Sequence, residues 1–344
     1  MSWSELTLHR QSVPTSQVLS TTAPPTTDGT VQFSSTISRP DVVFAALHAA
    51  VDSKSNIALL DPTLGTLTAG YIARLQSGTE LRGLLLSIPH RIAAGGMTIP
   101  TGLTTGLCVH QEHRGRRLAM SLIKSVVERG YLHQIMTGYH YFNVARSLSS
   151  VTMAAWYRPL QPLTAARQGY DLVVPVGTAY KDAGRHDYDL PTEEWPSRPT
   201  LLSDFKSRVI RSVMLAPPTE EEWKRLTSGP LRWLTVSTPS GTPALIAAYR
   251  AYYIATPPGG GGLIQGAQLV YCEACGSGSP LRAVQTIFTQ IARKHTVCHG
   301  ISMGPLVALA ADLRLVQTTE RYLDFYNLAL EPVPTAQEVS LLYM

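Results

Sequence analysis

Three arginines lie in one short turn of the chain, where they could bind a phosphorylated ligand. The turn reads Arg114-Gly115-Arg116-Arg117-Leu118-Ala119. It follows residues 106–110, an apolar run that predicts a buried strand, and it precedes residues 118–129, whose apolar spacing predicts a helix. The N–H groups of a helix start and nearby guanidinium groups are the donors that a pyrophosphate needs. A solvated basic turn is the alternative, but the position between a strand and a helix favours a phosphate site.

The rest of the chain supplies the elements that must position this turn. Apolar runs bounded by Gly, Pro and Ser predict strands at residues 56–60, 70–75, 84–88, 231–237, 244–254, 268–274 and 322–330, and an apolar run at 339–344 predicts a last one. Helical spacing predicts helices at residues 40–51, 219–226, 280–294 and 306–313. The second of these begins with Thr219 three residues before Glu222, which is the spacing of a capping box.

The chain of 344 residues is long enough for two hydrophobic cores. Pro and Gly are frequent between residues 172 and 199, which indicates a crossover between two parts of the protein. We expect one half at residues 1–165, the crossover segment at 166–200 and a second half at 201–344.

The composition excludes several classes of protein. Only 15% of the residues are charged and the net charge is +5, so the basic surplus is too small for a surface that coats nucleic acid. No apolar run approaches the ~18 residues of a membrane helix, and the N-terminus lacks the basic and apolar regions of a secretory signal. Four cysteines are too few for a disulfide scaffold. We expect a cytoplasmic protein with no nucleic-acid partner and no integral membrane segment.

Two further patterns carry little chemical signal. Cys272 and Cys275 form a Cys-x-x-Cys, but in a strand their side chains would point to opposite faces. Cys298 and His299 would be the only further ligands, so we expect no metal site. The four glycines at 259–262 lack the Lys-Ser/Thr of a phosphate-binding P-loop and predict an ordinary loop.

A set of short motifs follows the order found in one enzyme family. They are Leu107-Cys108-Val109-His110, Arg114-x-x-Arg117-Leu118-Ala119, Leu122-Ile123-Lys124 and, without a gap, Trp156-Tyr157-Arg158-Pro159-Leu160. Weaker echoes are Ser87-Ile88-Pro89 and Phe325-Tyr326-Asn327. Together they resemble the signature of the N-myristoyltransferases, a branch of the GNAT acyltransferase superfamily with a basic residue in place of the turn's middle glycine. The resemblance implies an α/β fold, with an α+β mixed sheet, made of two tandem GNAT-like halves in one saddle-shaped N-myristoyltransferase fold.

The family transfers a fatty acyl group, usually myristoyl, from CoA to the N-terminal glycine amine of a protein. The resemblance therefore implies myristoyl-CoA as co-substrate and a protein or peptide with an N-terminal glycine as partner. The amine attacks the thioester directly, so the site needs donors for the thioester oxygen and a base for the ammonium. By resemblance, the backbone N–H groups of Gly106 and Leu107 form the oxyanion hole, and the C-terminal carboxylate of Met344 is the base.

The resemblance also assigns residues to the two substrates. Those assigned to acyl-CoA are Leu107, Cys108, Val109, Arg114, Gly115, Arg116, Arg117, Leu118 and Ala119. Those assigned to the peptide are Phe33, Thr105, Tyr141, Tyr157 and Tyr326. Tyr141 stands where the family has the threonine that holds the glycine amine, and Thr105 stands where it has asparagine. Ala155 and Tyr157 replace an aromatic residue and a histidine of the peptide channel.

These departures on the acceptor side leave two alternatives open. One is a GNAT-type acyltransferase that uses another acyl-CoA or another acceptor. The other is a catalytically inactive descendant that keeps the fold as a binding or structural protein. In each case we expect a monomer that needs no metal.

Overall fold

The computed structural model describes the chain in separate segments. These are residues 15–18, 31–34, 58–59, 71–77, 80–142, 150–167, 213–227, 231–241, 243–255, 263–274, 279–331 and 333–343. The helix expected at 40–51, the glycine loop at 259–262, most of the expected crossover at 166–200, Cys275 and Met344 lie outside the described residues.

Strands outnumber helices in the segments described. The strands are β1 (Thr15–Val18), β2 (Val31–Ser34), β3 (Ala58–Leu59), β4 (Tyr71–Ser77), β5 (Glu80–Ala94), β6 (Met97–Val109), β7 (Thr137–Phe142), β8 (Val151–Pro159), β9 (Val213–Leu215), β10 (Arg232–Ser237), β11 (Pro243–Ala255), β12 (Leu263–Ala274), β13 (Val297–Ile301), β14 (Val316–Tyr326), β15 (Leu328–Glu331) and β16 (Val339–Ser340). The helices are α3 (Leu118–Leu132), α4 (Pro162–Arg167), α6 (Glu220–Thr227), α7 (Pro280–Ala292) and α8 (Pro305–Leu309), with the single turns η2 (Gln111–His113) and η3 (Ala336–Glu338). This is a mixed α/β fold, as the sequence predicts.

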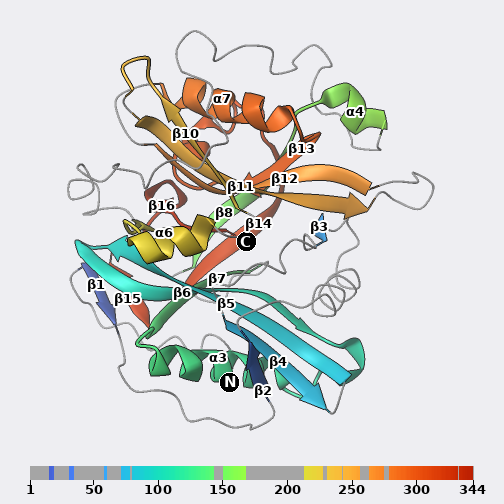
Figure 1. Cartoon of the computed structure of the whole chain (residues 1–344), viewed down its shortest axis with the longest axis vertical. Coiled ribbons are helices and arrows are strands. Elements are labelled where there is room, and N and C mark those ends of the chain that lie inside the picture. The colour runs from blue at the N-terminus through green and yellow to red at the C-terminus, as the bar shows by residue number, and fades with distance from the viewer. Residues whose placement is uncertain are drawn as a thin grey trace.

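Fourteen of the described strands form one sheet. Its order is β10-β11-β12-β13-β8-β14-β7-β6-β5-β4-β2, with β3, β9 and β16 paired beside this path, while β1 and β15 pair with each other. The sheet runs through the length of the molecule, with α7 at one end and α3 at the other (Figure 1).

The same order of elements occurs twice along this sheet. β5 and β6 pair antiparallel, α3 follows, and β7 returns parallel to β6. β11 and β12 pair antiparallel, α7 follows, and β13 returns parallel to β12. We call β4–β5–β6–α3–β7 the first unit and β10–β11–β12–α7–β13 the second unit. Between them β8 pairs with β13 and β14 pairs with β7, so each central strand joins the unit at the other end of the sequence.

α3 covers one face of the first unit. Its buried apolar residues fall at helical spacing and pack against β4 and β5 in one cluster that includes Leu122, Ile123, Val126, Leu75 and Leu85. Full burial of one such side chain contributes ~1.5–3 kcal/mol. The packing fixes the start of α3 relative to the end of β6.

The opposite face of the first unit contributes to a central core. This core joins Ile88, Ile92 and Tyr139 of the first unit to Trp233 and Ile246 of the second. It also contains the buried residues near the C-terminal end, Leu341 and Leu342. One cluster therefore holds both units and the C-terminal segment together.

The C-terminal elements differ from those expected. The strand predicted at 322–330 is two strands, β14 and β15, separated by Asn327, whose φ of 53° lies in the left-handed region. The Asn327 amide donates to the Tyr131 hydroxyl and the Met136 carbonyl, at 2.9 Å each, and these bonds hold the break. The last predicted strand is only β16, because the chain pairs with β9 for two residues, and the helix predicted at 306–313 is the shorter α8.

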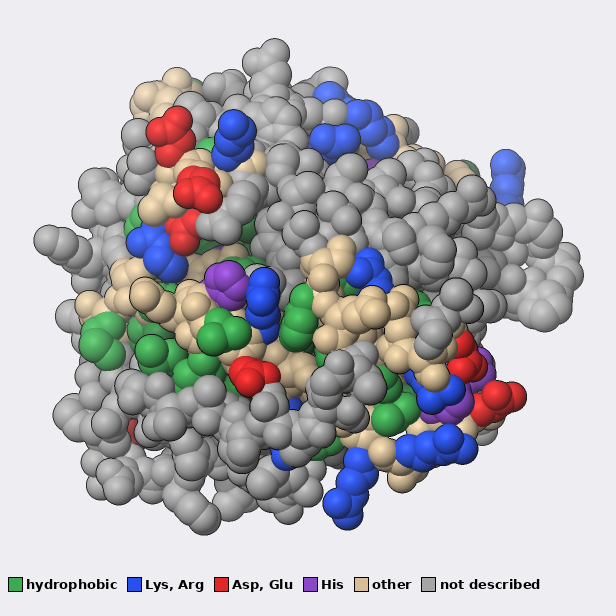
Figure 2. Space-filling view, turned by 60° about the horizontal axis from the view of Figure 1, so that its bottom comes forward, with side chains coloured by type: hydrophobic (Ala, Val, Ile, Leu, Met, Phe, Trp, Pro, Cys, Tyr) green, Lys and Arg blue, Asp and Glu red, His purple; other side chains and the backbone are tan. Residues whose placement is uncertain are grey.

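Charged side chains on the face shown in Figure 2 lie in small groups, some of mixed sign and one, at the upper right, with Lys or Arg but no acidic side chain. One such group, at the lower right, combines Lys or Arg side chains with His and acidic ones. β6 ends on this side of the molecule in Figure 1. The positive charge beside the end of β6 is therefore confined to a small part of the surface.

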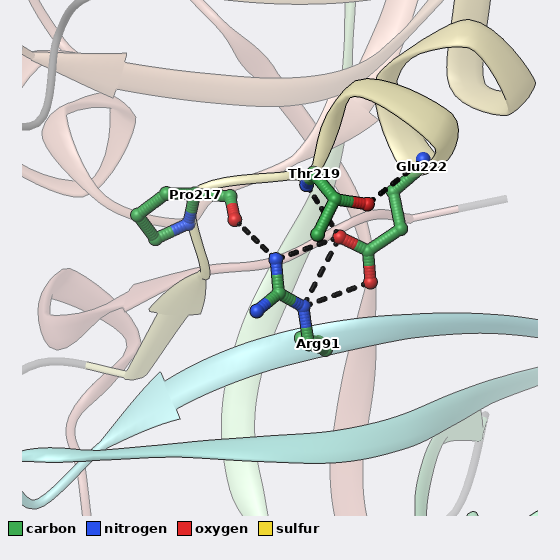
Figure 3. Close-up of polar contacts among 4 residues, drawn as sticks. All are labelled: Arg91, Pro217, Thr219 and Glu222. Carbon is green, nitrogen blue, oxygen red and sulfur yellow. Dashed lines mark hydrogen bonds and ion pairs between the residues drawn. The ribbon is translucent and has the colours of Figure 1, made fainter.

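A half-buried ion pair joins β5 to α6 (Figure 3). Arg91 Nε donates to Glu222 Oε1 at 2.8 Å, and Arg91 Nη2 donates to Glu222 Oε2 at 2.8 Å and to the Pro217 carbonyl at 2.7 Å. Glu222 also caps its own helix, because the Thr219 N–H donates to its carboxylate and its N–H donates to Thr219 Oγ1, as the capping-box spacing predicts. Burial raises the pKa of Glu222, but the bonds from Arg91 and Thr219 outweigh burial and lower it.

We expect the variant Arg91→Ala to lose about 2 kcal/mol of free energy of unfolding, because the Glu222 carboxylate and the Pro217 carbonyl then lack their donor. Urea denaturation at pH 7 measures this loss. Arg82→Ala is the matched control, since Arg82 pairs with Glu80 at the surface, where the two side chains are 34% and 48% exposed. That control should change stability by less than about 0.5 kcal/mol. Equal losses in the two variants would contradict the role given to Arg91.

Candidate functional site

β6 contains a bulge next to its C-terminal end. Leu84 pairs with Cys108 and Leu86 pairs with Thr105, so Gly106 and Leu107 stand together opposite one residue of β5. Gly106 has a φ of 67°, and a Cβ on it would lie 2.6 Å from Leu86 Cδ1. Backbone conformation and close packing both explain a glycine at this position.

The bulge lies beyond the point where β6 and β7 separate. In the described residues the parallel ladder between them ends at the pair Leu103 and Tyr139. From there β7 continues along β14, with Tyr141 paired to Leu323. The bulged residues therefore lie on the open side of β6, and the Leu107 side chain is 38% exposed.

The arginine turn connects this end of β6 to α3. Its backbone is compact because Gly115 and Arg117 have φ values of 78° and 60°, both left-handed. Arg114 Nε donates to the Val109 carbonyl at 3.2 Å, which folds this side chain back onto the end of β6. Arg116 and Arg117 are exposed. The predicted order of strand, basic turn and helix is thus observed. Residues 106–110, however, are half-buried or exposed and not buried as predicted, because they lie beyond the last pair of β6 with β7.

The start of α3 offers backbone donors beside these arginines. The N–H groups of Met120 and Ser121 donate to the Arg117 carbonyl, at 3.0 and 3.2 Å. The N–H groups before them, at the very start of the helix, have no carbonyl acceptor within the helix and are the donors for a ligand. The first turn contains no acidic residue. The turn thus combines backbone donors, a favourable helix dipole and two exposed guanidinium groups, an arrangement that suits a phosphate.

The C-terminal segment enters the central core near the open end of the two strands. Leu341 and Leu342 are fully buried, and β16 before them pairs parallel with β9. The Tyr343 ring packs edge-on against Tyr141, with 5.0 Å between centroids. Met344, the predicted base, follows directly but lies outside the described residues.

One peptide group of this segment is bound from two sides. Its carbonyl, on Leu342, accepts a hydrogen bond from the Tyr139 hydroxyl of β7 at 3.3 Å. Its N–H, on Tyr343, donates to the Val270 carbonyl of β12 at 2.8 Å. Val270 is itself the bulged residue of β12, because Ala248 pairs with Tyr271 and Tyr249 pairs with Leu269. The first and second units thus hold the Leu342–Tyr343 peptide between them.

Tyr141 presents a buried hydroxyl at this place. Within the described part of the chain this hydroxyl has no hydrogen-bond partner. Burial first, and the neighbouring Tyr343 second, raise its pKa well above the usual range. Because a buried hydroxyl without a partner is costly, it marks a position where a polar group of a ligand could bind.

The structure separates the other residues predicted for the peptide. Phe33 lies in β2 beneath the Arg129 guanidinium, 5.5 Å from ring centroid to Cζ, and belongs with Tyr326 to the cluster that packs on α3. Tyr157 lies in β8 directly opposite His299 of β13. Thr105 precedes the β6 bulge. Of the five predicted residues, Thr105 and Tyr141 flank the separation of β6 and β7, whereas Phe33 and Tyr326 lie on the α3 side of the sheet.

Two hollows lie near these elements. A cavity of about 30 Å³ lies between α3 and the place where β6 and β7 begin to separate. Its lining includes Gly102, Gly138, Val126 and Val127. Its volume is that of about one water molecule. A larger groove of about 410 Å³ lies at the start of α7, beside α8 and the residues before Leu341.

The sequence was compared with known proteins. No family model matches it. The chain is 27% identical over 144 aligned positions to the glycylpeptide N-tetradecanoyltransferase of Dictyostelium discoideum, and the match covers 39% of this chain and 35% of that protein. The matched part thus spans about a third of the length of this curated relative.

The structure was compared with solved structures. Saccharomyces cerevisiae N-myristoyltransferase with bound myristoyl-CoA superimposes with a TM-score of 0.70, at 14% identity, over 96% of this chain and 92% of the yeast chain. The chain has the N-myristoyltransferase fold. A second structure of the yeast enzyme with bound myristoyl-CoA gives a TM-score of 0.68 at 14% identity, over 95% and 88% of the two chains. The resemblance inferred from the motifs, and the fold expected from it, are therefore confirmed.

Within this N-myristoyltransferase fold, a buried histidine was missed by reasoning from the sequence. His90 lies between Ile88 and Ile92, and the alternation in β5 places all three on one face. Its Nδ1 lies 2.9 Å from the Ile88 carbonyl and its Nε2 lies 3.0 Å from the Tyr139 hydroxyl. The sequence did contain a signal for this histidine, since His90 is a polar residue at a strand position where the alternation predicts an apolar one.

Among the described residues of the N-myristoyltransferase fold, no helix combines the length and hydropathy of a membrane-spanning segment.

We expect the free energy of unfolding to fall as the pH is lowered from about 6.5 to about 4. Burial lowers the pKa of both His90 and His299 from 6.5 to about 4, so in this window the unfolded chain binds protons that the folded chain excludes. Each histidine contributes a slope of about 1.4 kcal/mol per pH unit, with its full stabilisation present above pH 6.5.

Urea denaturation at pH 7 and pH 5 measures this slope. The variant His90→Leu removes one of the two titrating groups, so the difference between the two pH values should shrink by about 2 kcal/mol. An unchanged difference in His90→Leu would show that His90 does not titrate as expected.

Proposed function

We propose that this protein transfers a fatty acyl group, myristoyl in the first instance, from CoA to the N-terminal glycine amine of a peptide or protein. The observation that supports the proposal most is the convergence of three features at the open end of β6 and β7. These are the bulge at Gly106 and Leu107, the arginine turn at the start of α3, and the C-terminal segment that reaches Tyr141.

The arginine turn is the proposed binding site for the CoA pyrophosphate. Arg116 and Arg117 provide exposed positive charge, and the start of α3 provides N–H donors. A phosphate bound here would place the rest of CoA along the end of β6, because the turn follows that strand directly. The thioester would then lie near the bulge.

The proposed reaction needs no nucleophilic side chain. A base takes a proton from the glycine ammonium, and the neutral amine attacks the thioester carbon. The N–H groups of Gly106 and Leu107 donate to the oxyanion that forms; loss of one such donor typically costs ~10²–10³ in rate. The C–S bond then breaks, the attacking nitrogen gives up one proton to the leaving sulfur, and the amide and the free CoA thiol are formed. In this proposal the base is the carboxylate of Met344, next to Tyr343.

Two other functions remain candidates, each on one observation. A GNAT-type transferase with a shorter acyl donor is favoured by the arginine turn and the β6 bulge, because these two features suit acyl-CoA whatever the length of its acyl chain. An inactive acyl-CoA-binding protein is favoured by Tyr141, whose ring packs on Tyr343 where the family has a small threonine.

One experiment separates these functions. The full chain is incubated with a peptide that begins with glycine and with equal amounts of myristoyl-CoA and acetyl-CoA, and the peptide mass is measured. We expect the peptide to gain a myristoyl group. Gain of an acetyl group alone would favour the short-donor transferase, and acyl-CoA binding without any change in peptide mass would favour the inactive protein. A peptide with a blocked N-terminus is the matched control.

We expect Arg117→Asn to weaken acyl-CoA binding by about tenfold or more, because it removes a charged donor to phosphate. Asparagine tolerates the left-handed φ of 60° at this position, so the turn should keep its shape. Calorimetric titration with acyl-CoA measures the affinity. Arg232→Ala, at an exposed position of β10 in the second unit, is the control and should bind as the unmodified protein does. Equal effects of the two substitutions would argue against the turn as the phosphate site.

A further inference from the structure

The Tyr139 hydroxyl lies between two hydrogen-bond acceptors. His90 Nε2 is 3.0 Å away and the Leu342 carbonyl oxygen is 3.3 Å away. A phenol has one proton to donate. Tyr139 therefore cannot make both bonds fully at the same time when His90 is neutral.

The neighbours of His90 determine which of its nitrogens carries the proton. Nδ1 lies 2.9 Å from the Ile88 carbonyl, which can only accept, so Nδ1 carries the hydrogen. In the neutral ring Nε2 is then an acceptor that faces Tyr139. Burial lowers the pKa of His90 to about 4, and the Ile88 bond and the charge of Glu222 offset only part of this effect. His90 is thus neutral at physiological pH.

We propose that His90 and the Leu342 carbonyl compete for the single proton of Tyr139, and that this competition sets how firmly the C-terminal segment is held. Tyr139 and His90 are then positioning residues, because they act through the peptide group of Leu342 and Tyr343 that precedes Met344. Their effect on catalysis rests on the proposed function, whereas their effect on the segment does not.

Burial makes this competition consequential. His90 is 4% exposed and Tyr139 is fully buried, with the two rings edge to face at 5.4 Å. Water therefore cannot replace the bond that is not made. The Leu342 carbonyl and the Tyr343 N–H belong to one rigid peptide plane, so motion of the carbonyl after loss of the Tyr139 bond also weakens the bond from the Tyr343 N–H to the Val270 carbonyl.

Amide hydrogen exchange at Tyr343 tests the proposal without any assay of activity. His90→Leu removes the competing acceptor, so Tyr139 donates to Leu342 alone and exchange at Tyr343 should slow by about fivefold. Tyr139→Phe removes the donor and should speed exchange by a similar factor. In the Tyr139→Phe background, His90→Leu should have no further effect.

The two substitutions should change the exchange rate at Tyr343 in opposite directions, which a merely structural role of His90 and Tyr139 would not produce. If His90→Leu speeds exchange as Tyr139→Phe does, loss of packing explains both variants and the proposal is overturned. Thr286→Val is the control, because it removes a buried hydroxyl that donates to the Arg282 carbonyl within α7. It should leave exchange at Tyr343 unchanged.

A kinetic measurement then separates this inference from the proposed function. We expect Tyr139→Phe to lower kcat for acyl transfer about fivefold with an unchanged KM for acyl-CoA, since Tyr139 lies away from the arginine turn. If the unmodified protein transfers no acyl group, the proposed function fails, while the exchange result still decides the competition for the proton. If exchange changes as expected but kcat does not, the positioning role in catalysis is overturned.

Discussion

The two units of this protein bind opposite sides of the peptide group between Leu342 and Tyr343. Its carbonyl is bound by Tyr139 of β7 and its N–H by Val270 of β12, so neither unit alone can hold it. The residues on its two sides, Leu342 and Tyr343, pack into the core that the units share. The position of the chain beyond this peptide therefore depends on how the whole sheet is assembled.

Local patterns in the sequence were sufficient to predict the strand, the basic turn and the helix around Arg117, because strand alternation, turn residues and helical spacing are all local. They were insufficient for β7 and β8, whose places depend on pairing with β14 and β13 from the other end of the sequence. The break at Asn327 depends on partners almost 200 residues away, the farther being Tyr131 at a separation of 196. The contact between His90 and Tyr139 crosses β6 and likewise required the sheet order.

The fold persists at 14% identity to the yeast enzyme, which indicates that backbone geometry is what this arrangement requires. A bulge, a separation of two strands and a left-handed residue before a helix are features of the main chain, and they restrict few side chains. Gly106 is one restricted position, because its φ of 67° strains a residue with a side chain and a Cβ there would lie 2.6 Å from Leu86 Cδ1. Tyr141 is a contrasting position, because its large ring is accommodated by edge-on packing against Tyr343.

β8 and β14 each pair with the unit from the other end of the sequence, and this pairing limits where the chain can be cut. A fragment that ends after β8 would carry a strand whose two neighbours are both missing, and the complementary fragment would carry β14 with the same defect. Each piece would expose an unpaired edge in the middle of a sheet, which invites aggregation. The native partner of each edge lies in the other piece, so two fragments produced in one cell should regain order by reassociation, whereas neither should do so alone.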